Sequence, residues 1–142
     1  MTRKSLACVL LGAAIAGCGV EKLAIKNYEG PDRPVEQVAL LKPQMFIRIH
    51  SIDGDISKSF VTWKQFGSTD ADMAFVPGIH RFAVSHRDSS AQSRSIMEIQ
   101  QELLAGHRYL LRGTLGQNQT WMPQILDVTD RPDYRCISAP RC

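Results

Sequence analysis

The stretch MFIRIHSIDGD, residues 45–55, decides the fold class of this chain. Its side chains alternate between two faces, with Ile47, Ile49 and Ser51 on one face and Phe46, Arg48 and His50 on the other. Alternation with a period of two is typical of a β-strand that buries one of its faces. Asp53-Gly54 is a strong turn signal at the end of this strand. We therefore expect residues 59–63 to form the returning strand.

Other short β-type segments follow along the chain, separated by turn signals. Pro77-Gly78 precedes an alternating strand that places His80, Phe82 and Val84 on one face. Pro123, inside the final segment, favours a position at the edge of a sheet. The remaining predicted strands are 38–41 before Pro43, 107–112 after the Ala105-Gly106 turn, and 120–128.

Residues 96–104 are ambiguous, because their apolar positions fit both a helix and a strand. With or without them, the chain contains six or seven short strands separated by turns. This pattern predicts a mainly β fold, a small antiparallel β-sandwich over residues 36–130.

The first eighteen residues have the organisation of an export signal. Arg3 and Lys4 precede residues 5–17, which carry no charge, and this run ends at Cys18. A helix of that length spans about 20 Å, which is less than the roughly 30 Å hydrocarbon core of a bilayer. We therefore predict a secretory signal over residues 1–17 and not a transmembrane helix.

Ile15-Ala16-Gly17-Cys18 resembles the lipobox of bacterial lipoprotein precursors, in which an aliphatic residue and two small residues precede a cysteine. The resemblance implies cleavage before Cys18, a diacylglycerol thioether on its sulfur and an acyl chain on its new amino group. Two or three acyl chains anchor a protein stably, whereas one chain anchors it only marginally. The alternative is an ordinary signal peptide in which Cys18 is a plain thiol.

Gly19 bears on which membrane would hold the anchor. An aspartate at this position resembles an inner-membrane retention signal, so its absence favours the outer membrane, with the domain facing the periplasm. Residues 18–35 are then expected to be the lipidated N-terminus and a polar tether, on which Tyr28 is a candidate to pack against the domain.

The mature part would have 125 of the 142 residues, enough for one compact domain. Its formal charge falls from +3 to about +1 when Arg3 and Lys4 are removed, and basic residues are scattered among acidic ones. The sequence therefore indicates no nucleic-acid partner. We also predict no cofactor apart from the covalent lipid.

Two cysteines lie in the C-terminal tail, residues 131–142. Cys136 and Cys142 form an even pair in an exported chain, which favours a disulfide between them. Two unpaired thiols are the alternative, and the spacing matches no zinc-binding pattern.

The mature part also carries a resemblance of its own. The segments IDGD, VPGIHRFAV and LLAGHRYLLR resemble a loose group of small bacterial envelope lipoproteins and sandwich modules, over roughly residues 36–128. The matching positions are turn residues, namely Gly54, Pro77, Gly78 and Gly106. The resemblance implies a prealbumin-like or immunoglobulin-like sandwich and no particular chemistry.

No catalytic or metal-binding motif stands out. The histidines His50, His80, His86 and His107 lack ligand spacing, so surface or packing roles are favoured over a metal site. Asp53 and Asp55 lack the rest of a calcium loop, and a hairpin turn is the favoured interpretation.

Aromatic residues are the candidates for a recognition surface, because aromatics are enriched at interfaces. These candidates are Trp63, Trp121 and Tyr134; for Trp63 and also for Tyr109, a place in the core is the favoured interpretation.

Taken together, these features predict a non-enzymatic, lipid-anchored periplasmic protein that binds an envelope protein or glycan or serves a structural role. The alternative is an accessory lipoprotein subunit of a secretion or cell-wall assembly machine. An enzymatic role would require titratable groups that meet in a pocket.

Overall fold

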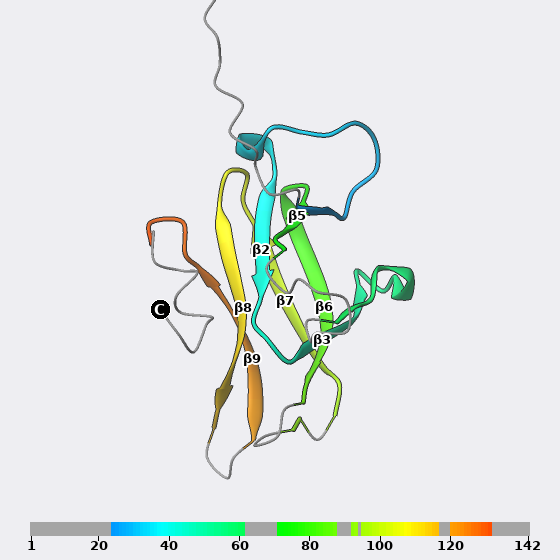
Figure 1. Cartoon of the computed structure of the whole chain (residues 1–142), viewed down its shortest axis with the longest axis vertical. Helices are drawn as coiled ribbons and strands as arrows, with labels where there is room; N and C mark the ends of the chain where they lie inside the picture. The colour runs from blue at the N-terminus through cyan, green and yellow to red at the C-terminus, as the bar shows by residue number, and fades with distance from the viewer. Residues whose placement is uncertain (1–23, 62–70, 88–91, 94, 117–119, 132–142) are drawn as a thin grey trace, which may run out of the picture.

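The chain folds into two β-sheets packed face to face, as the computed structural model shows for residues 24–61, 71–87, 92–93, 95–116 and 120–131 (Figure 1). One sheet has five strands in the order β1-β5-β2-β8-β9, and the other has four in the order β4-β3-β6-β7. The predicted mainly β sandwich is confirmed.

The strands and helices are short, as the frequent turn signals in the sequence predict. The five-stranded sheet contains β1 (Ile25–Lys26), β5 (Met73–Phe75), β2 (Ala39–Pro43), β8 (Arg108–Leu115) and β9 (Trp121–Asp127). The four-stranded sheet contains β4 (Phe60–Val61), β3 (Ile47–Ile52), β6 (Gly78–His86) and β7 (Met97–Leu103). Two 3₁₀ helices complete the described elements, η1 (Val35–Gln37) and η2 (Ile56–Lys58).

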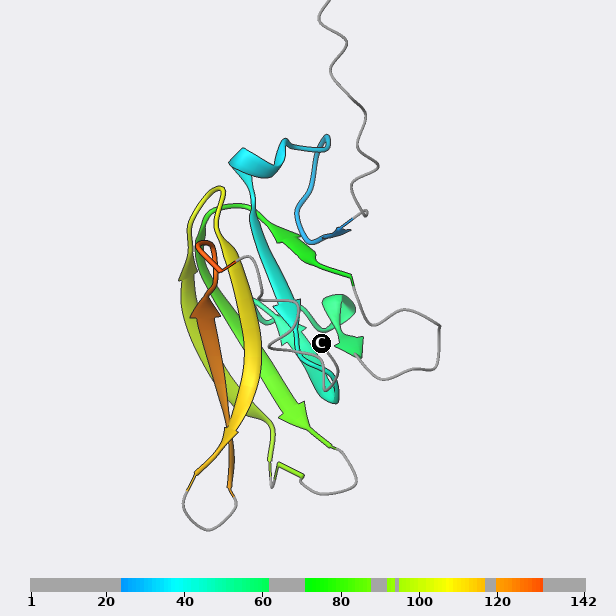
Figure 2. The ribbon, with the colours of Figure 1, turned by 60° about the vertical axis from the view of Figure 1, so that its left-hand side comes forward.

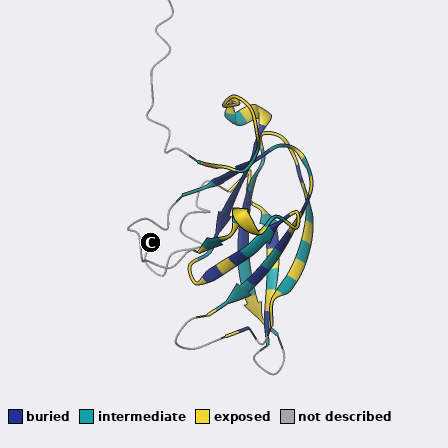
Figure 3. Ribbon diagram, turned by 90° about the vertical axis from the view of Figure 1, so that its right-hand side faces the viewer, coloured by how far each residue is buried: buried dark blue, intermediate teal, exposed yellow. Residues whose placement is uncertain are grey.

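The core lies between the two sheets and is built from their inward-facing side chains. The rings of Phe75 and Phe82, one from each sheet, meet edge to face with centroids 5.5 Å apart. Buried and more exposed residues alternate along β6 and β7 (Figure 3), whereas β2 and β5 are buried throughout. On β6 the predicted inward face is confirmed, because His80, Phe82 and Val84 are all buried.

The strand from which the fold was predicted contains an irregularity. In β3 the pairing with β6 shifts between Ile49 and Ser51, so His50 is an extra residue in a β-bulge. Ile47 and Ile49 are buried and share one face as predicted, but the bulge turns Ser51 outward and brings Ile52 into the core. The predicted face of Ser51 is therefore wrong. The turn after it and the returning strand are confirmed, since β4 pairs antiparallel with β3.

The sandwich is not purely antiparallel, which corrects the prediction. β2 pairs parallel with β8, and β1 pairs parallel with β5. A parallel pair needs a long crossover connection, and the whole four-stranded sheet lies in sequence between β2 and β8. The ambiguous segment forms strand β7, and β9, which contains Pro123, lies at a sheet edge as predicted.

The fold begins before residue 36, the start of the predicted domain. The N–H of Ile25 donates to the carbonyl of Asp72 at 2.7 Å, and that of Asn27 donates to Ala74 at 2.9 Å. Ala24, Tyr28 and Val35 pack against a small cluster of Val38, Leu40 and Ala74. Residues 24–35 therefore belong to the domain and are not a free tether (Figure 2).

Candidate functional site

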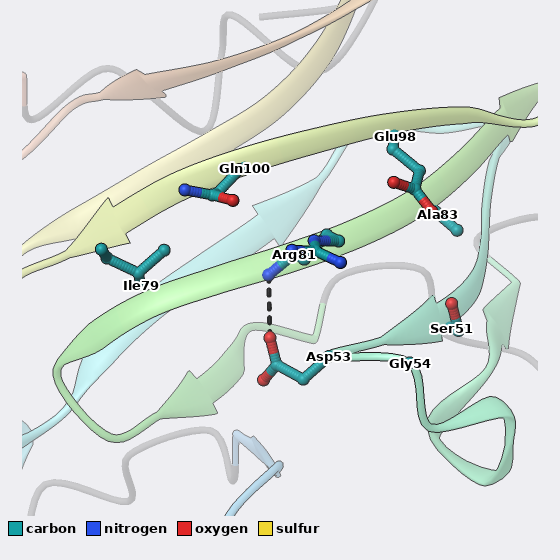
Figure 4. A pocket seen from close by; sticks show the side chains of 8 residues that line it. All are labelled: Ser51, Asp53, Gly54, Ile79, Arg81, Ala83, Glu98 and Gln100. Atoms are coloured by element: carbon teal, nitrogen blue, oxygen red, sulfur yellow. Dashed lines mark hydrogen bonds between the residues drawn. The ribbon is translucent and has the colours of Figure 1, made fainter.

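A hollow of about 300 Å³ lies on the outer face of the four-stranded sheet, turned away from the core (Figure 4). Strands β3, β6 and β7 and the turn after β3 supply its walls and floor. It is lined by Ser51, Asp53, Gly54, Ile79, Arg81, Ala83, Glu98 and Gln100.

Small side chains in the centre of the sheet create this hollow. Ala83 on β6 lies directly between Ser51 on β3 and Glu98 on β7, in one row across three strands. In the next row, Arg81 lies beside Gln100. Because the side chains of Ser51 and Ala83 are short, the longer side chains of the site enclose an empty space above them.

A tight turn closes the hollow on the β3 side. Asp53 and Gly54 both have positive φ, at 54° and 84°. Two left-handed residues in succession make the two-residue hairpin turn that matches strand twist, and Asp-Gly favours it. Ile52 and Asp55 flank the turn and exchange both backbone hydrogen bonds, at 2.9 and 3.2 Å. The turn role predicted for this Asp-Gly pair is confirmed.

The carboxylate of Asp53 fastens this turn to β6. Its Oδ1 accepts the backbone N–H of Arg81 at 2.8 Å, and its Oδ2 lies 2.7 Å from Nδ1 of His80. The other ring nitrogen of His80, Nε2, donates to the carbonyl of Val76 at 2.8 Å. Both ring nitrogens of this buried histidine therefore face oxygen atoms.

The pKa of the Asp53 carboxyl is lowered as a result. Partial burial acts to raise this pKa, but hydrogen bonds from Arg81 and His80, with the positive charges of His80 and Lys58, outweigh it. Asp53 is thus held ionised by its structural partners. Its two oxygens are already engaged in holding the turn.

The other polar side chains of the hollow are uncommitted. In the described part of the chain, the guanidinium of Arg81 and the carboxylate of Glu98 make no hydrogen bond or salt bridge, and neither does the amide of Gln100. A cation, an anion and an amide therefore stand on rigid strands with their hydrogen-bonding groups open to a ligand.

The four histidines lie at separate places and not in one cluster. His50 Nε2 lies 2.8 Å from the Ser85 hydroxyl, and its pKa is lowered by burial and by the charge of Arg48. His107 Nδ1 lies 2.7 Å from Asp127 Oδ2. Among the described residues, no group of three or more His, Cys, Asp or Glu side chains is arranged to hold a metal ion.

The Asp127 carboxylate resembles that of Asp53 in its role. It binds His107 and also accepts hydrogen bonds from the N–H and hydroxyl of Thr129. Burial alone raises its pKa, but the bonds from Thr129 and His107 lower it overall. Asp55, the second aspartate weighed as a calcium ligand, instead accepts the N–H of Ser57 at 2.9 Å and caps η2.

Trp121 does not lie on an exposed recognition surface, which corrects that prediction. It is 3% exposed and its indole stacks on the His86 ring, with centroids 5.3 Å apart and planes 11° from parallel. Tyr109 is also buried, and its hydroxyl accepts the N–H of Leu104 at 3.0 Å, so the core interpretation of Tyr109 is confirmed.

Several predicted positions lie outside the described residues. These are the signal segment 1–17, the lipidation site Cys18, the aromatic candidates Trp63 and Tyr134, and the cysteines Cys136 and Cys142. The described part of the chain contains no helix with the length and hydrophobicity of a membrane span.

The sequence pattern did not single out Arg81, Glu98 or Gln100. The alternation of β6 does imply that Arg81 faces away from Phe82. Which residues lie beside Arg81 on the next strand depends on how β6 is aligned with β7. The alternation within one strand does not specify this alignment.

Comparison with protein-family models, with curated protein sequences and with solved structures returns no match. The function proposed for this chain therefore rests on its motifs and its geometry.

Proposed function

We propose that this chain is a non-enzymatic, lipid-anchored binding protein of the bacterial cell envelope. Cys18 carries the lipid and holds the domain at the periplasmic face of the outer membrane. The outer face of the four-stranded sheet binds an envelope component, a protein or a glycan.

The observation that carries the binding role is the set of uncommitted polar side chains around the hollow. Arg81 offers a planar fork of N–H donors, Glu98 offers acceptors and Gln100 offers both. All three project from paired strands, so the backbone that carries them loses little conformational freedom on binding. Ala83, which is partly buried at the base of the hollow, and Ile79, which is 65% exposed, add apolar contact area.

The start of the fold supports a location close to the membrane. Backbone pairing begins at Ile25, and the chain from Cys18 to that point spans at most roughly 25 Å when fully extended. Segment 24–35 pairs and packs with the sandwich, so it does not lengthen the connection between the domain and Cys18. A lipid on Cys18 would keep the sandwich within about one domain diameter of the bilayer surface.

A site-specific crosslinker in living cells tests the binding role. A photoreactive residue in place of Gln100, on the rim of the hollow, should form a discrete adduct with an envelope component. The same residue in place of Gln124, an exposed glutamine on β9 of the other sheet, is the matched control. We expect the adduct at position 100 alone, and we expect Arg81→Ala to reduce its yield at least about fivefold, the effect of one charge-assisted hydrogen bond.

Two results would contradict the proposal. One is the absence of any adduct at position 100 in cells that contain the folded protein. The other is equal adduct yield at positions 100 and 124, because this would indicate unspecific proximity and not a binding face.

A further inference from the structure

Strand β7 is an edge of the four-stranded sheet and has a strand neighbour in that sheet on one side only. It is seven residues long, against two for β4 at the opposite edge. Long edge strands present a row of unpaired backbone N–H and C=O groups, which can pair with another strand.

The register shows which residues of β7 face the free side. Arg81 directs both its N–H and its C=O toward the Asp53 turn on the β3 side, so β6 must use its even-numbered residues to pair with β7. Those residues lie opposite Met97, Ile99, Gln101 and Leu103. Glu98, Gln100 and Glu102 therefore direct their backbone groups to the free edge.

A second contact agrees with this assignment. The side-chain amide of Gln101 donates to the carbonyl of Glu102 at 3.1 Å, so this carbonyl is not used by β6. Among the described residues, the backbone groups of Glu98 and Gln100 have no such cover, and no turn or loop hydrogen bond reaches them. A hydrogen bond thus occupies the edge at Glu102, whereas the described residues give no hydrogen-bond partner to the backbone groups of Glu98 and Gln100.

The side chains of β7 define what a neighbouring strand would meet. On the outer face, Glu98 and Glu102 are exposed and negative, on either side of Gln100. On the inner face, Met97 and Ile99 are only partly buried and pack against the edge of the core. Residues directly opposite one another in paired strands interact, so the partner strand should be basic outside and apolar inside.

We propose that the free edge of β7 accepts an extended segment of a partner protein as an added strand, and that this segment alternates basic and apolar residues. Main-chain hydrogen bonds to Glu98 and Gln100 would supply affinity, and the alternating side chains would supply specificity. The proposal deepens the binding function proposed above, because Glu98 and Gln100 also line the hollow.

Charge argues against a second copy of this chain as the occupant. In the antiparallel pairing centred on Gln100, each Glu98 would lie opposite a Glu102 of the other copy. Like charges directly opposite one another destabilise a pair of strands.

Amide hydrogen exchange with a synthetic peptide tests the proposal. The probe is a nine-residue peptide that alternates lysine and valine, added to the full-length chain in detergent. At saturation, exchange at the amides of Glu98 and Gln100 should slow at least about tenfold, because both become hydrogen-bonded. A peptide with lysines and valines in separate blocks keeps the same charge and should give no protection.

Variants separate strand addition from unspecific charge attraction. Gln100→Pro removes an N–H that β6 does not use, so the sheet should persist while the affinity for the alternating peptide falls at least about tenfold. Gln100→Ala keeps the N–H, so its loss of affinity should be at least about fivefold smaller than that of Gln100→Pro. Glu98→Lys with Glu102→Lys should reverse the preference toward a peptide that alternates glutamate and valine.

A result that contradicts strand addition can be distinguished from a result that contradicts ligand binding in the hollow. Arg81→Ala should weaken the crosslink at the hollow far more than it changes the peptide affinity, because the Arg81 backbone still pairs with the Asp53 turn. Unchanged exchange at Glu98 and Gln100, equal affinity for the two lysine peptides, or dimers formed through β7 in the absence of peptide would each overturn strand addition.

Discussion

Single side chains fix the geometry around the hollow, and Asp53 does so most directly. One carboxylate holds the backbone of Arg81 and the ring of His80, and thereby sets the position of the turn against β6. Short polar residues tolerate the left-handed conformation that Asp53 adopts. The turn was predictable from Asp-Gly, whereas its partners 27 and 28 residues away were not.

Asp53→Asn should reduce the free energy of unfolding at neutral pH by about 1 kcal/mol, because it keeps the turn but removes the charge that faces His80. The pKa of Asp53 is lowered in the folded state, so its contribution is full above the unfolded value of about 3.9. The contribution is lost as the pH falls through the lowered pKa. Urea unfolding from about pH 7 to pH 3 measures the difference between the two proteins.

The difference should therefore shrink in acid. A constant difference across that range would contradict the assigned role of the charge. Asp130→Asn is the control, since Asp130 is exposed and has no hydrogen-bond or ion-pair partner in the described residues.

Gly113 provides the space for the Trp121 indole. A Cβ added at Gly113 would lie 1.6 Å from Nε1 of Trp121, so the indole would have to leave its stack on His86. We expect Gly113→Ala to cost about 3 kcal/mol of stability, in the range of severe overpacking. Gly116→Ala is the matched control, because its Cβ would meet nothing closer than 3.5 Å.

Thermal unfolding of the two variants measures this difference. Equal melting temperatures for Gly113→Ala and Gly116→Ala would mean that Trp121 does not occupy the core. The burial of Trp121 was missed because its partner, His86, lies 35 positions away in sequence and on the other sheet.

At the scale of elements, period-two alternation predicts a face correctly only while the strand remains regular. In β6 it placed His80, Phe82 and Val84 on the inward face correctly, because no irregularity interrupts the pairing with β7. In β3 it failed after Ile49, because the bulge at His50 exchanges the two faces. A bulge is a property of two strands together, and the sequence of one strand does not mark it.

Deletion of His50 should be tolerated for this reason. Without the extra residue, Ile49, Ser51 and Ile52 keep their present faces in a regular strand. We expect a loss below about 2 kcal/mol, mainly from the hydrogen bond between His50 and Ser85. Deletion of Ala83 from the regular strand β6 should instead exchange the faces of its two halves and prevent folding.

Circular dichroism and urea unfolding compare the two deletions. If both variants unfold, or if the His50 deletion is the more damaging one, the bulge is not the reason for the change of face.

At the scale of the whole molecule, the two sheets and their core followed from the strand pattern, whereas the pairing of distant strands did not. The parallel pair of β2 and β8 joins segments about 70 residues apart, with register Leu41↔Tyr109. The same limit applies to the hollow, whose row from Ser51 to Glu98 crosses three strands. Local patterns specify elements and faces, and only the assembled sheet brings Arg81, Glu98 and Gln100 together.

Because the fold begins at residue 24, the domain would lie closer to a lipid on Cys18 than a free tether over residues 18–35 would allow. Ala24, Tyr28 and Val35 pack on the cluster of Val38, Leu40 and Ala74, so only the few residues after Cys18 would connect the sandwich to the proposed lipid. The proposed function therefore depends on the modification of one cysteine, because the proposed anchor would decide where the proposed binding face is presented.

Palmitate labelling of cells, combined with mass spectrometry of the mature N-terminus, tests that anchor most directly. We predict label on the wild-type chain, none on Cys18→Ala, and a mature N-terminal peptide that begins at a Cys18 carrying diacylglycerol and an acyl chain. Equal labelling of the two chains, or a mature N-terminus downstream of Cys18, would contradict the proposed lipid anchor.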